Sequence, residues 1–378
     1  MVCKKFMLDL INSIYAYVFI FMLFMAFKIP AKYFLAILAH LLLVFLTNGV
    51  LFPAEYMPDQ FRYIHSASSI RDSGFDLSAY IDFDENRALN VSNAGLFFSL
   101  FPIPFLDSIY SISVINFMLF SLVFIYLYKK RVLTGYSIWL YLLFPSFALY
   151  SAIASRDILI FVVMIISFYQ AYRGNSIISI ILATPLLLIK AQNFIIYLLS
   201  LMAYLVLKKY HHKQFLQFIL MLGFAFGCIV FLLTFIQIDA LNIVRMNMFL
   251  EDGGIVSEYN PLNSWQDVFR YGFTGIFYTF LYPLPWEVNG PLQLIQFFEN
   301  IIIFVIIVWV CKRLIKLDND FKYLLFSYLI SHAAIYGLVI SNYGTLARYK
   351  FSFILIFLLF AIKLLYDEAL KLNHRGNV

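Results

Sequence analysis

The sequence predicts an all-α, polytopic integral membrane protein with about 11 transmembrane helices, short re-entrant or interfacial helices and two external loops. Of its 378 residues, 63% are hydrophobic and only 13% are charged, and the mean hydropathy is +0.86. A soluble domain averages about 25% charged residues, so this chain lacks the polar exterior that water requires. This composition excludes cytosolic enzymes, secreted domains and nucleic-acid-binding modules, and a lipid bilayer is the expected environment.

Apolar segments long enough to cross about 30 Å of hydrocarbon recur along the chain. We expect them to be helices, because lipid offers no partners to unpaired backbone groups. Two shorter apolar stretches that contain Pro or Gly, 92–106 and 271–283, are expected to be re-entrant or interfacial. No linker or internal repeat divides the chain, so residues 1–378 are expected to form a single transmembrane domain. The expected spans are residues 7–27, 33–53, 108–128, 134–153, 157–172, 176–189, 192–207, 214–236, 291–311, 321–341 and 350–366.

Clusters of Lys and Arg set the predicted orientation, because cytoplasmic loops of membrane proteins are rich in these residues. With these clusters in the cytoplasm, the first long loop, 54–90, and the second, 237–290, are external. If 92–106 stays out of the bilayer core, the chain has eleven spans and an external N-terminus. If 92–106 crosses, there are twelve spans and loop 54–90 becomes cytoplasmic; we favour eleven because 92–106 is short and contains two prolines. The clusters lie at residues 129–131, 173, 208–213 and 312–316.

A second set of cations lies on the predicted external side, where Lys and Arg are usually scarce. Several border apolar spans, where a charge costs roughly 2.5–3.5 kcal/mol on insertion scales. One interpretation is that each anchors a helix end or pairs locally, as Arg156 could with Asp157. The alternative is that the set converges on a phosphate-bearing lipid, since arginine binds phosphate bidentately. The set comprises Arg62, Arg156, Lys190, Arg245, Arg270 and Arg348.

The first external loop begins Pro58-Asp-Gln-Phe-Arg-Tyr63, which predicts a helix start with Asp59, Arg62 and Tyr63 on one face. A carboxylate beside arginines at the membrane surface could act as a base toward a sugar hydroxyl. The alternative is a helix N-terminal acid stabilised by the helix dipole. Farther along the loop, Asp82-Phe-Asp84-Glu85 has a spacing often seen around Mg²⁺ or Mn²⁺. Acids are common in solvated loops, so no metal site is predicted.

Five short motifs follow one another along the chain. In this order they resemble those of the Wzy-like bacterial polymerases of O-antigen and capsule repeat units, which are multi-spanning relatives of the GT-C glycosyltransferases. The similarity extends over most of the chain, and its most specific part is the last motif. The motifs are Pro58-Asp-Gln-Phe-Arg-Tyr63, Pro145-Ser with Ser155-Arg-Asp157, Lys190-Ala-Gln-Asn193, Tyr282-Pro-Leu-Pro-Trp286 with Glu299, and Asn342-Tyr-Gly-Thr-Leu-Ala-Arg-Tyr-Lys350.

The resemblance implies a multi-pass enzyme of the bacterial inner (cytoplasmic) membrane that works at the periplasmic face. It implies undecaprenyl-diphosphate-linked glycans and membrane lipids as partners and leaves the binding of a chain-length regulator open. No cofactor, metal or nucleic acid is expected. Arginines are expected to stabilise the leaving diphosphate, while Asp59 is the candidate base. The expected catalytic residues are Asp59, Arg156 and Arg348, and the expected substrate-binding residues are Arg62, Tyr63, Asp157, Lys190, Arg245, Arg270, Trp286 and Tyr349.

Two other functions stay open from the sequence. A GT-C glycosyltransferase with a polyprenyl-phosphate sugar donor would share nearly every feature above, and a metal dependence traced to Asp82 and Asp84 would favour it. A transporter or flippase for polysaccharides or lipid-linked sugars predicts charges at mid-span. In this sequence only His332 is clearly placed there.

Overall fold

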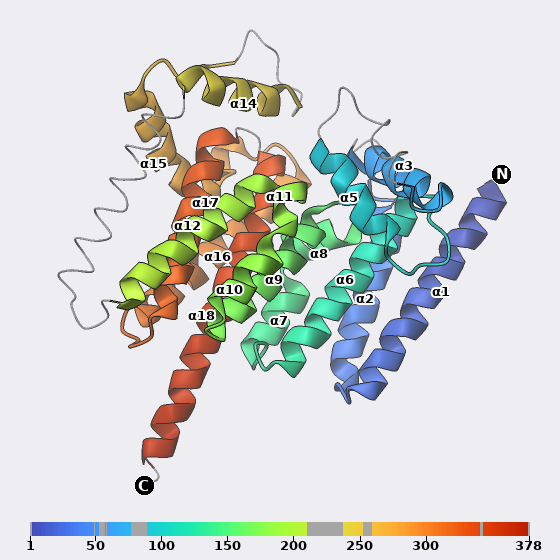
Figure 1. Ribbon diagram of the computed structural model, residues 1–378, viewed down its shortest axis with the longest axis horizontal. Helices are drawn as coiled ribbons and strands as arrows, with labels where there is room; N and C mark the ends of the chain where they lie inside the picture. The colour runs from blue at the N-terminus through green and yellow to red at the C-terminus, as the bar shows by residue number, and fades with distance from the viewer. Residues whose placement is uncertain are drawn as a thin grey trace. The chain divides into compact units, whose positions relative to one another are not determined.

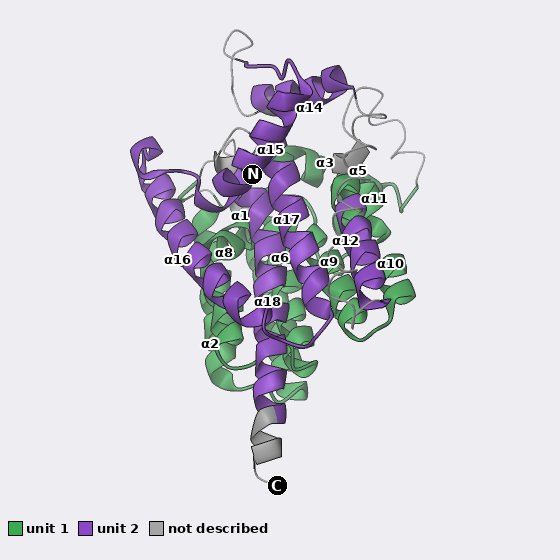
Figure 2. Ribbon diagram, turned by 90° about the vertical axis from the view of Figure 1, so that its left-hand side faces the viewer, with its two compact units in different colours: residues 1–194 green, residues 195–378 purple. Residues whose placement is uncertain are grey.

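The computed structural model describes residues 2–48, 50–52, 57, 59–76, 89–209, 237–251, 259–340 and 343–376. Within these residues the regular structure is helical, and the only β-type pairing is an isolated bridge between Asn48 and Phe52. The all-α prediction is therefore confirmed. The chain divides into two compact units, residues 1–194 and 195–378 (Figure 2). The expectation of a single domain stays a prediction.

Five helices in the described part of the chain are long and apolar enough to cross a membrane, as expected of a membrane protein. The prediction of about 11 spans is not met. Ala31–Thr47 has only 17 residues, about 26 Å at 1.5 Å per residue. The expected spans 134–153 and 176–189 are each broken just before a proline, Pro145 and Pro185, and 214–236 lies outside the described residues. The five helices are Phe6–Ala26, Ile109–Lys129, Ala191–Lys209, Pro291–Leu314 and Phe321–Val339.

Unit 1 is a bundle arranged around one long helix, α6, which contacts α1, α2, α3, α8 and α9. Aromatic side chains fill the space between these helices. Phe120 of α6 packs against Tyr141 of α7 and Phe147 of α8, and Phe147 packs in turn against Phe161 of α9. The helices of unit 1 are α1 (Val2–Ala26), α2 (Ala31–Thr47), α3 (Asp59–Asp72), α5 (Leu89–Ser99), α6 (Ile109–Lys129), α7 (Tyr136–Leu143), α8 (Pro145–Ala152), α9 (Asp157–Tyr172), α10 (Ser176–Ala183) and α11 (Pro185–Ile189).

Two short helices, α3 and α5, pack together at one end of unit 1 (Figure 1). With 14 and 11 residues, they are about 21 and 16 Å long, too short to cross a bilayer. They approach closely because position 95 is glycine, where a Cβ atom would collide with Ser66 Oγ. The expectation that segment 92–106 does not cross the membrane stays a prediction.

Arg71, at the end of α3, holds the turn that follows α5. Its guanidinium donates hydrogen bonds to the carbonyls of Ser99, Phe101 and Ile103, over distances of 2.6 to 3.3 Å. Burial lowers the pKa of Arg71, and the neighbouring carboxylates of Asp72 and Asp107 oppose that effect. Arg71 is therefore committed to backbone groups of its own unit.

Unit 2 is built from longer helices, and α17 packs against both α15 and α18. The second external loop of the sequence prediction, 237–290, is largely helical in its described part, since it contains α14, α15 and a 3-10 turn, η3. A capping box of Ser264 and Asp267 starts α15, and bonds from Asn263 and Ser264 lower the pKa of Asp267. α12 (Ala191–Lys209) leads into α14 (Ile238–Glu251), α15 (Trp265–Leu281), η3 (Pro285–Glu287), α16 (Pro291–Leu314), α17 (Phe321–Val339) and α18 (Tyr343–Gly376).

In unit 2, α15 and α17 approach each other closely. Gly275 and Gly337 face each other backbone to backbone, so that a Cβ on either would collide with the other. One turn farther along α15, the Thr279 hydroxyl donates to the carbonyl of Ala333 at 3.1 Å and to that of Gly275 at 2.8 Å. Small residues four apart on both helices thus permit the backbone contact that is common between membrane helices.

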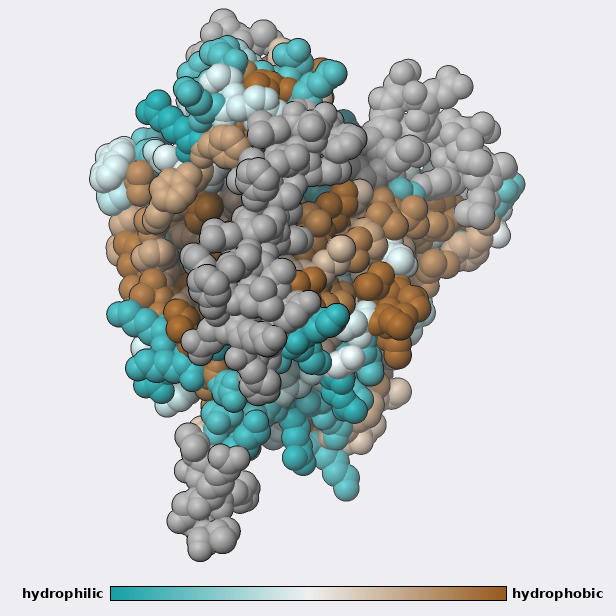
Figure 3. All heavy atoms as spheres, turned by 60° about the vertical axis from the view of Figure 1, so that its left-hand side comes forward, coloured by the Kyte–Doolittle hydropathy of each residue, from teal (hydrophilic) through white to brown (hydrophobic). Residues whose placement is uncertain are grey.

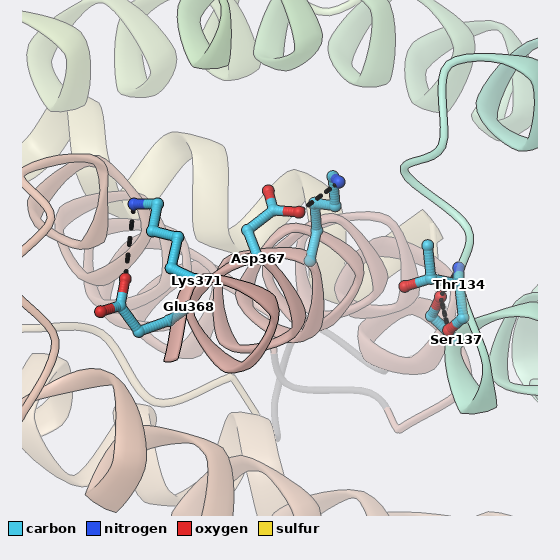
Figure 4. A network of polar contacts seen from close by, with 6 residues as sticks. Thr134, Ser137, Asp367, Glu368 and Lys371 are labelled. Atoms are coloured by element: carbon cyan, nitrogen blue, oxygen red, sulfur yellow. Dashed lines mark hydrogen bonds and ion pairs between the residues drawn. The ribbon is translucent and has the colours of Figure 1, made fainter. Parts of the chain in front are cut away.

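Exposed side chains along the helices are apolar, whereas charged side chains gather toward the ends, as a bilayer requires. α2 and α16 expose apolar side chains, such as Leu35 and Ile302, and Figure 3 shows hydrophobic residues gathered on the visible face with hydrophilic ones beyond them. The last turns of α18 carry ion pairs, Lys363 with Asp367 at 2.6 Å and Lys371 with Glu368 at 3.4 Å (Figure 4). Apolar stretches therefore end in charged segments, as at a membrane–water boundary.

Candidate functional site

The charged groups of unit 1 separate into two sets at opposite ends of its helices. One set, which includes Lys32 and Lys129, surrounds the α1–α2 turn and the end of α6; Tyr33 packs against Tyr128 there, and Lys129 lies over the ring of Phe27. The other set lies where α3 and α9 begin and where α11 ends. It contains the charged residues of unit 1 that the sequence analysis predicted for the site, Asp59, Arg62, Arg156, Asp157 and Lys190, and Tyr63 lies beside them on α3.

Arg156 and Asp157 stand at the start of α9, after a break in the helical path. α8 ends at Ala152, Ile153 is extended, and Arg156 is the residue that precedes the first turn of α9. Both side chains are buried, Arg156 at 7% exposure and Asp157 at 3%. Arg156 thus directly precedes the positive end of the α9 dipole, where Asp157 supplies the one acid of the first turn, and the start of a helix favours an anion.

Side chains from three other helical segments bond the backbone of this break. Asn48, directly after α2, donates to the Ala152 carbonyl at 2.9 Å. Asn116 of α6 donates to the carbonyls of Ile153 and Ser155 at 2.7 and 2.9 Å. The amide of Ala154 donates to Gln60 Oε1 of α3 at 3.3 Å. The break is thus a held, buried segment, in line with the requirement that irregular backbone at membrane depth be satisfied by protein.

The Gln60 contact brings the start of α3 to the start of α9, although the two lie more than ninety residues apart in sequence. Asp59 and Arg62 form an ion pair at 3.6 Å, with side-chain exposures of 30% and 49%. Tyr63 is fully buried, edge-on against Phe98 of α5. Asp59 and Arg62 are thus open to solvent beside the break, while Tyr63 packs α3 against α5.

Lys190 occupies the junction between α11 and α12, where the helix breaks again. Its side chain is buried, and its carbonyl accepts the amide of Asn193 at 3.0 Å. α11 packs against both α5 and α9, and Asn93 of α5 donates to the Leu188 carbonyl at 2.8 Å. The structure therefore collects the predicted unit 1 residues on one connected group of elements.

In unit 2, Arg348 and Tyr349 lie on α18 in an aromatic setting. The Arg348 guanidinium is 5.6 Å from the centre of the Tyr349 ring, and Tyr349 stacks on Tyr336 of α17. His332, one turn earlier on α17, is buried with Nδ1 at 3.1 Å from the carbonyl of Tyr328. That geometry fits a hydrogen-bonded core histidine.

Lys350, two residues after Arg348, forms a buried polar cluster with Asn300 and Tyr282. Its ammonium donates to Asn300 Oδ1 at 2.7 Å and to the Tyr282 carbonyl at 3.4 Å, and Asn300 Nδ2 donates to that carbonyl at 2.6 Å. Asn300 is nine residues into α16, roughly 14 Å from its start. The carbonyl of Tyr282, directly after α15, therefore lies beside α16 about nine residues past the start of that helix.

The remaining predicted residues of unit 2 are more open. Arg245 of α14 is half-buried, with its guanidinium 5.4 Å from the ring of Tyr271; burial raises the pKa of Tyr259, an effect that Arg245 opposes. Arg270 is exposed on α15, and Trp286 of η3 is 77% exposed. Along α15, Arg270 precedes Tyr282 by about 18 Å, so Arg270 is distant from the Lys350 cluster.

Four residues that form these contacts were not predicted from the sequence: Gln60 and Asn116 at the α8–α9 break, and Asn300 and Lys350 in the buried cluster of unit 2. Lys350 and Gln60 stand inside quoted motifs, and a lysine next to an apolar run signals a polar contact in the fold. Asn116 sits among apolar residues of α6, and polar side chains in such helices usually face other helices. Its partners, the carbonyls of Ile153 and Ser155 between α8 and α9, could be found only in three dimensions.

Metal ligation has little to build on in the part of the chain that the structure describes, because no group of three His, Cys, Asp or Glu side chains comes together there. Asp82, Asp84 and Glu85 lie outside the described residues. Comparison with known proteins gives no match: no family model, curated protein or solved structure is significantly similar to this chain. A function therefore has to be inferred from residues and geometry.

Proposed function

We propose that this protein is a polysaccharide polymerase of the bacterial inner membrane, which joins undecaprenyl-diphosphate-linked oligosaccharide repeat units at the periplasmic face. The observation that carries the proposal is the α8–α9 break. There, a buried arginine sits at a helix start and the solvent-open Asp59–Arg62 pair lies beside it through the Gln60 contact. A cationic helix terminus suits a diphosphate, and a neighbouring carboxylate suits an acceptor hydroxyl.

The proposed step transfers the growing chain from its lipid carrier to a new unit. The acceptor hydroxyl oxygen bonds to the anomeric carbon of the donor, and the bond from that carbon to the diphosphate breaks. Undecaprenyl diphosphate leaves with the bonding electrons, and the hydroxyl proton passes to the carboxylate of Asp59. Arg156 stabilises the charge that develops on the leaving group, and Lys190 adds positive charge on the same elements.

The arrangement of charges supports the periplasmic assignment. Lys32 and Lys129 mark one end of unit 1, while Arg156, Asp157 and Lys190 lie at the other. Under the positive-inside rule the first end is cytoplasmic, so the α8–α9 break faces the periplasm. Arg348 and Tyr349 are assigned to the same substrate on their sequence motif alone.

A deletion strain tests this proposal. Its lipopolysaccharide or capsule ladder is expected to collapse to a single repeat unit, and the wild-type gene is expected to restore the ladder. Arg156→Ala and Arg348→Ala are expected to restore little. Arg173→Ala, at the cytoplasmic end of α9, serves as the control and is expected to restore a full ladder at equal protein abundance. A strain that loses one sugar from every repeat unit would point to a single-sugar GT-C transferase instead.

A further inference from the structure

We infer that Asn116, supported by Gln60 and Asn48, is a positioning residue for Arg156: it holds the α8–α9 break in the one path that sets the arginine at the start of α9. The inference rests on the proposed function. It deepens that function by assigning a role to a side chain on a different helix, α6, which the sequence motifs do not include.

The break needs such support because its backbone lacks helical partners. Between Ala152 and Asp157, three carbonyls and one amide are bonded by side chains of Asn48, Asn116 and Gln60. The break itself is completely buried at Ala152, Ala154 and Ser155. A buried backbone group that is left without a hydrogen-bond partner is strongly unfavourable. Without these side chains, the backbone groups of the break would find partners only if α8 and α9 joined into one continuous helix or if the break opened to water.

Asn116 is the centre of this arrangement. It is completely buried, and its Nδ2 donates two hydrogen bonds to carbonyls on either side of Ala154. Its Oδ1 accepts no hydrogen bond from the described residues. The side chain therefore acts through its donors alone, and an isosteric acid or leucine removes both of them.

Ser155 connects Asn116 to the start of α9. The Ser155 carbonyl accepts from Asn116, its hydroxyl accepts the amide of Asp157 at 3.3 Å, and the same hydroxyl donates to the Tyr150 carbonyl at 3.1 Å. Arg156 lies between these two anchored residues. Its backbone is thus fixed from both sides, and the place from which its side chain starts depends on Asn116.

Kinetics of chain extension by the purified full-length protein test the coupling. Arg156→Ala is expected to slow extension by roughly tenfold to a hundredfold, the loss of one charge-assisted contact. Asn116→Leu is expected to slow it by about tenfold, and the double variant is expected to be no slower than Arg156→Ala alone. Asn12→Leu is the matched control, because Asn12 is an equally buried asparagine that bonds the backbone of Phe105. It is expected to leave the rate unchanged.

Hydrogen exchange of the peptide 150–157 reads the break directly and does not depend on activity. Asn116→Leu and the milder Gln60→Leu are expected to speed exchange there by about tenfold, and Asn12→Leu to leave it unchanged. Two results would overturn this inference and leave the proposed function intact. One is a reduced extension rate for Arg156→Ala with a wild-type rate for Asn116→Leu; the other is a double variant whose rate falls by the product of the two single effects. A normal rate for Arg156→Ala would remove the proposed site, and the inference with it. An unchanged rate of hydrogen exchange in both Asn116→Leu and Gln60→Leu would also overturn the inference.

Discussion

One contact in each unit shows a different way of joining helices. In unit 1, polar side chains reach across to backbone: Asn116 bonds the α8–α9 break and Arg71 bonds the turn after α5. In unit 2, the key contact depends on side chains that are missing, because Gly275 meets Gly337 backbone to backbone. Unit 1 is therefore expected to weaken by degrees as side chains are removed, whereas unit 2 is expected to fail when one is added.

The largest expected effect comes from Gly337→Leu. A side chain at this position has no room against Gly275, so α15 and α17 must separate, at a cost above about 3 kcal/mol. Protein abundance in the membrane and thermal unfolding after extraction measure the outcome. Gly272→Ala on the partner helix α15, where no atom lies near the added methyl, is the control and is expected to be neutral or slightly stabilising. Equal abundance of both variants would show that the glycine contact is not what joins these helices.

The next effect separates the two jobs of Asn300 in unit 2. Asn300→Leu leaves the buried Lys350 ammonium without its 2.7 Å acceptor and is expected to cost about 2–4 kcal/mol. Asn300→Asp keeps an acceptor for Lys350 but puts a carboxylate oxygen against the Tyr282 carbonyl, which Nδ2 had bonded at 2.6 Å. Because the charge-assisted bond between Lys350 and a carboxylate offsets this repulsion, a smaller loss is expected. Thermal unfolding in nanodiscs compares them, with the exposed Asn289→Ala as control. Equal losses for both variants would argue against the Lys350 contact.

The smallest effect compares two arginines on α3. Arg71→Ala removes four hydrogen bonds to carbonyls and is expected to destabilise unit 1 by about 2–3 kcal/mol. Arg62→Ala removes only an exposed pair with Asp59 and is expected to cost less than about 1 kcal/mol. Limited proteolysis and thermal unfolding report both. If Arg62→Ala proves the more damaging, the account of how α3 is held is wrong.

The sequence predicted the helical class, because apolar runs of span length allow little else in lipid. It overestimated the number of long spans, since Pro145 and Pro185 each interrupt an apolar run that was taken as continuous. Helix periodicity placed Tyr63 on the same face as Asp59 and Arg62. α5 covers Tyr63 with Phe98, and no pattern local to α3 contains that packing.

Part of the candidate site could likewise be predicted from the sequence. Charged residues beside apolar runs identified Arg156, Asp157 and Lys190, and the structure places all three on one connected group of helices in unit 1. The groups that hold them could not be found in this way. In the sequence, Asn116 does not differ from other polar residues of buried helices. Its role depends on hydrogen bonds to the carbonyls of Ile153 and Ser155, which come close to it only in the folded protein.

The most direct test of the proposed function is chain extension in a defined system. Lipid-linked single repeat units, purified from the deletion strain, would be mixed with the protein in liposomes without metal or nucleotide sugar. The account predicts products of two or more units, release of undecaprenyl diphosphate, and a rate for Arg156→Ala that is roughly tenfold to a hundredfold lower. Lipid-linked units that remain single, with the wild-type protein folded and inserted, would contradict it.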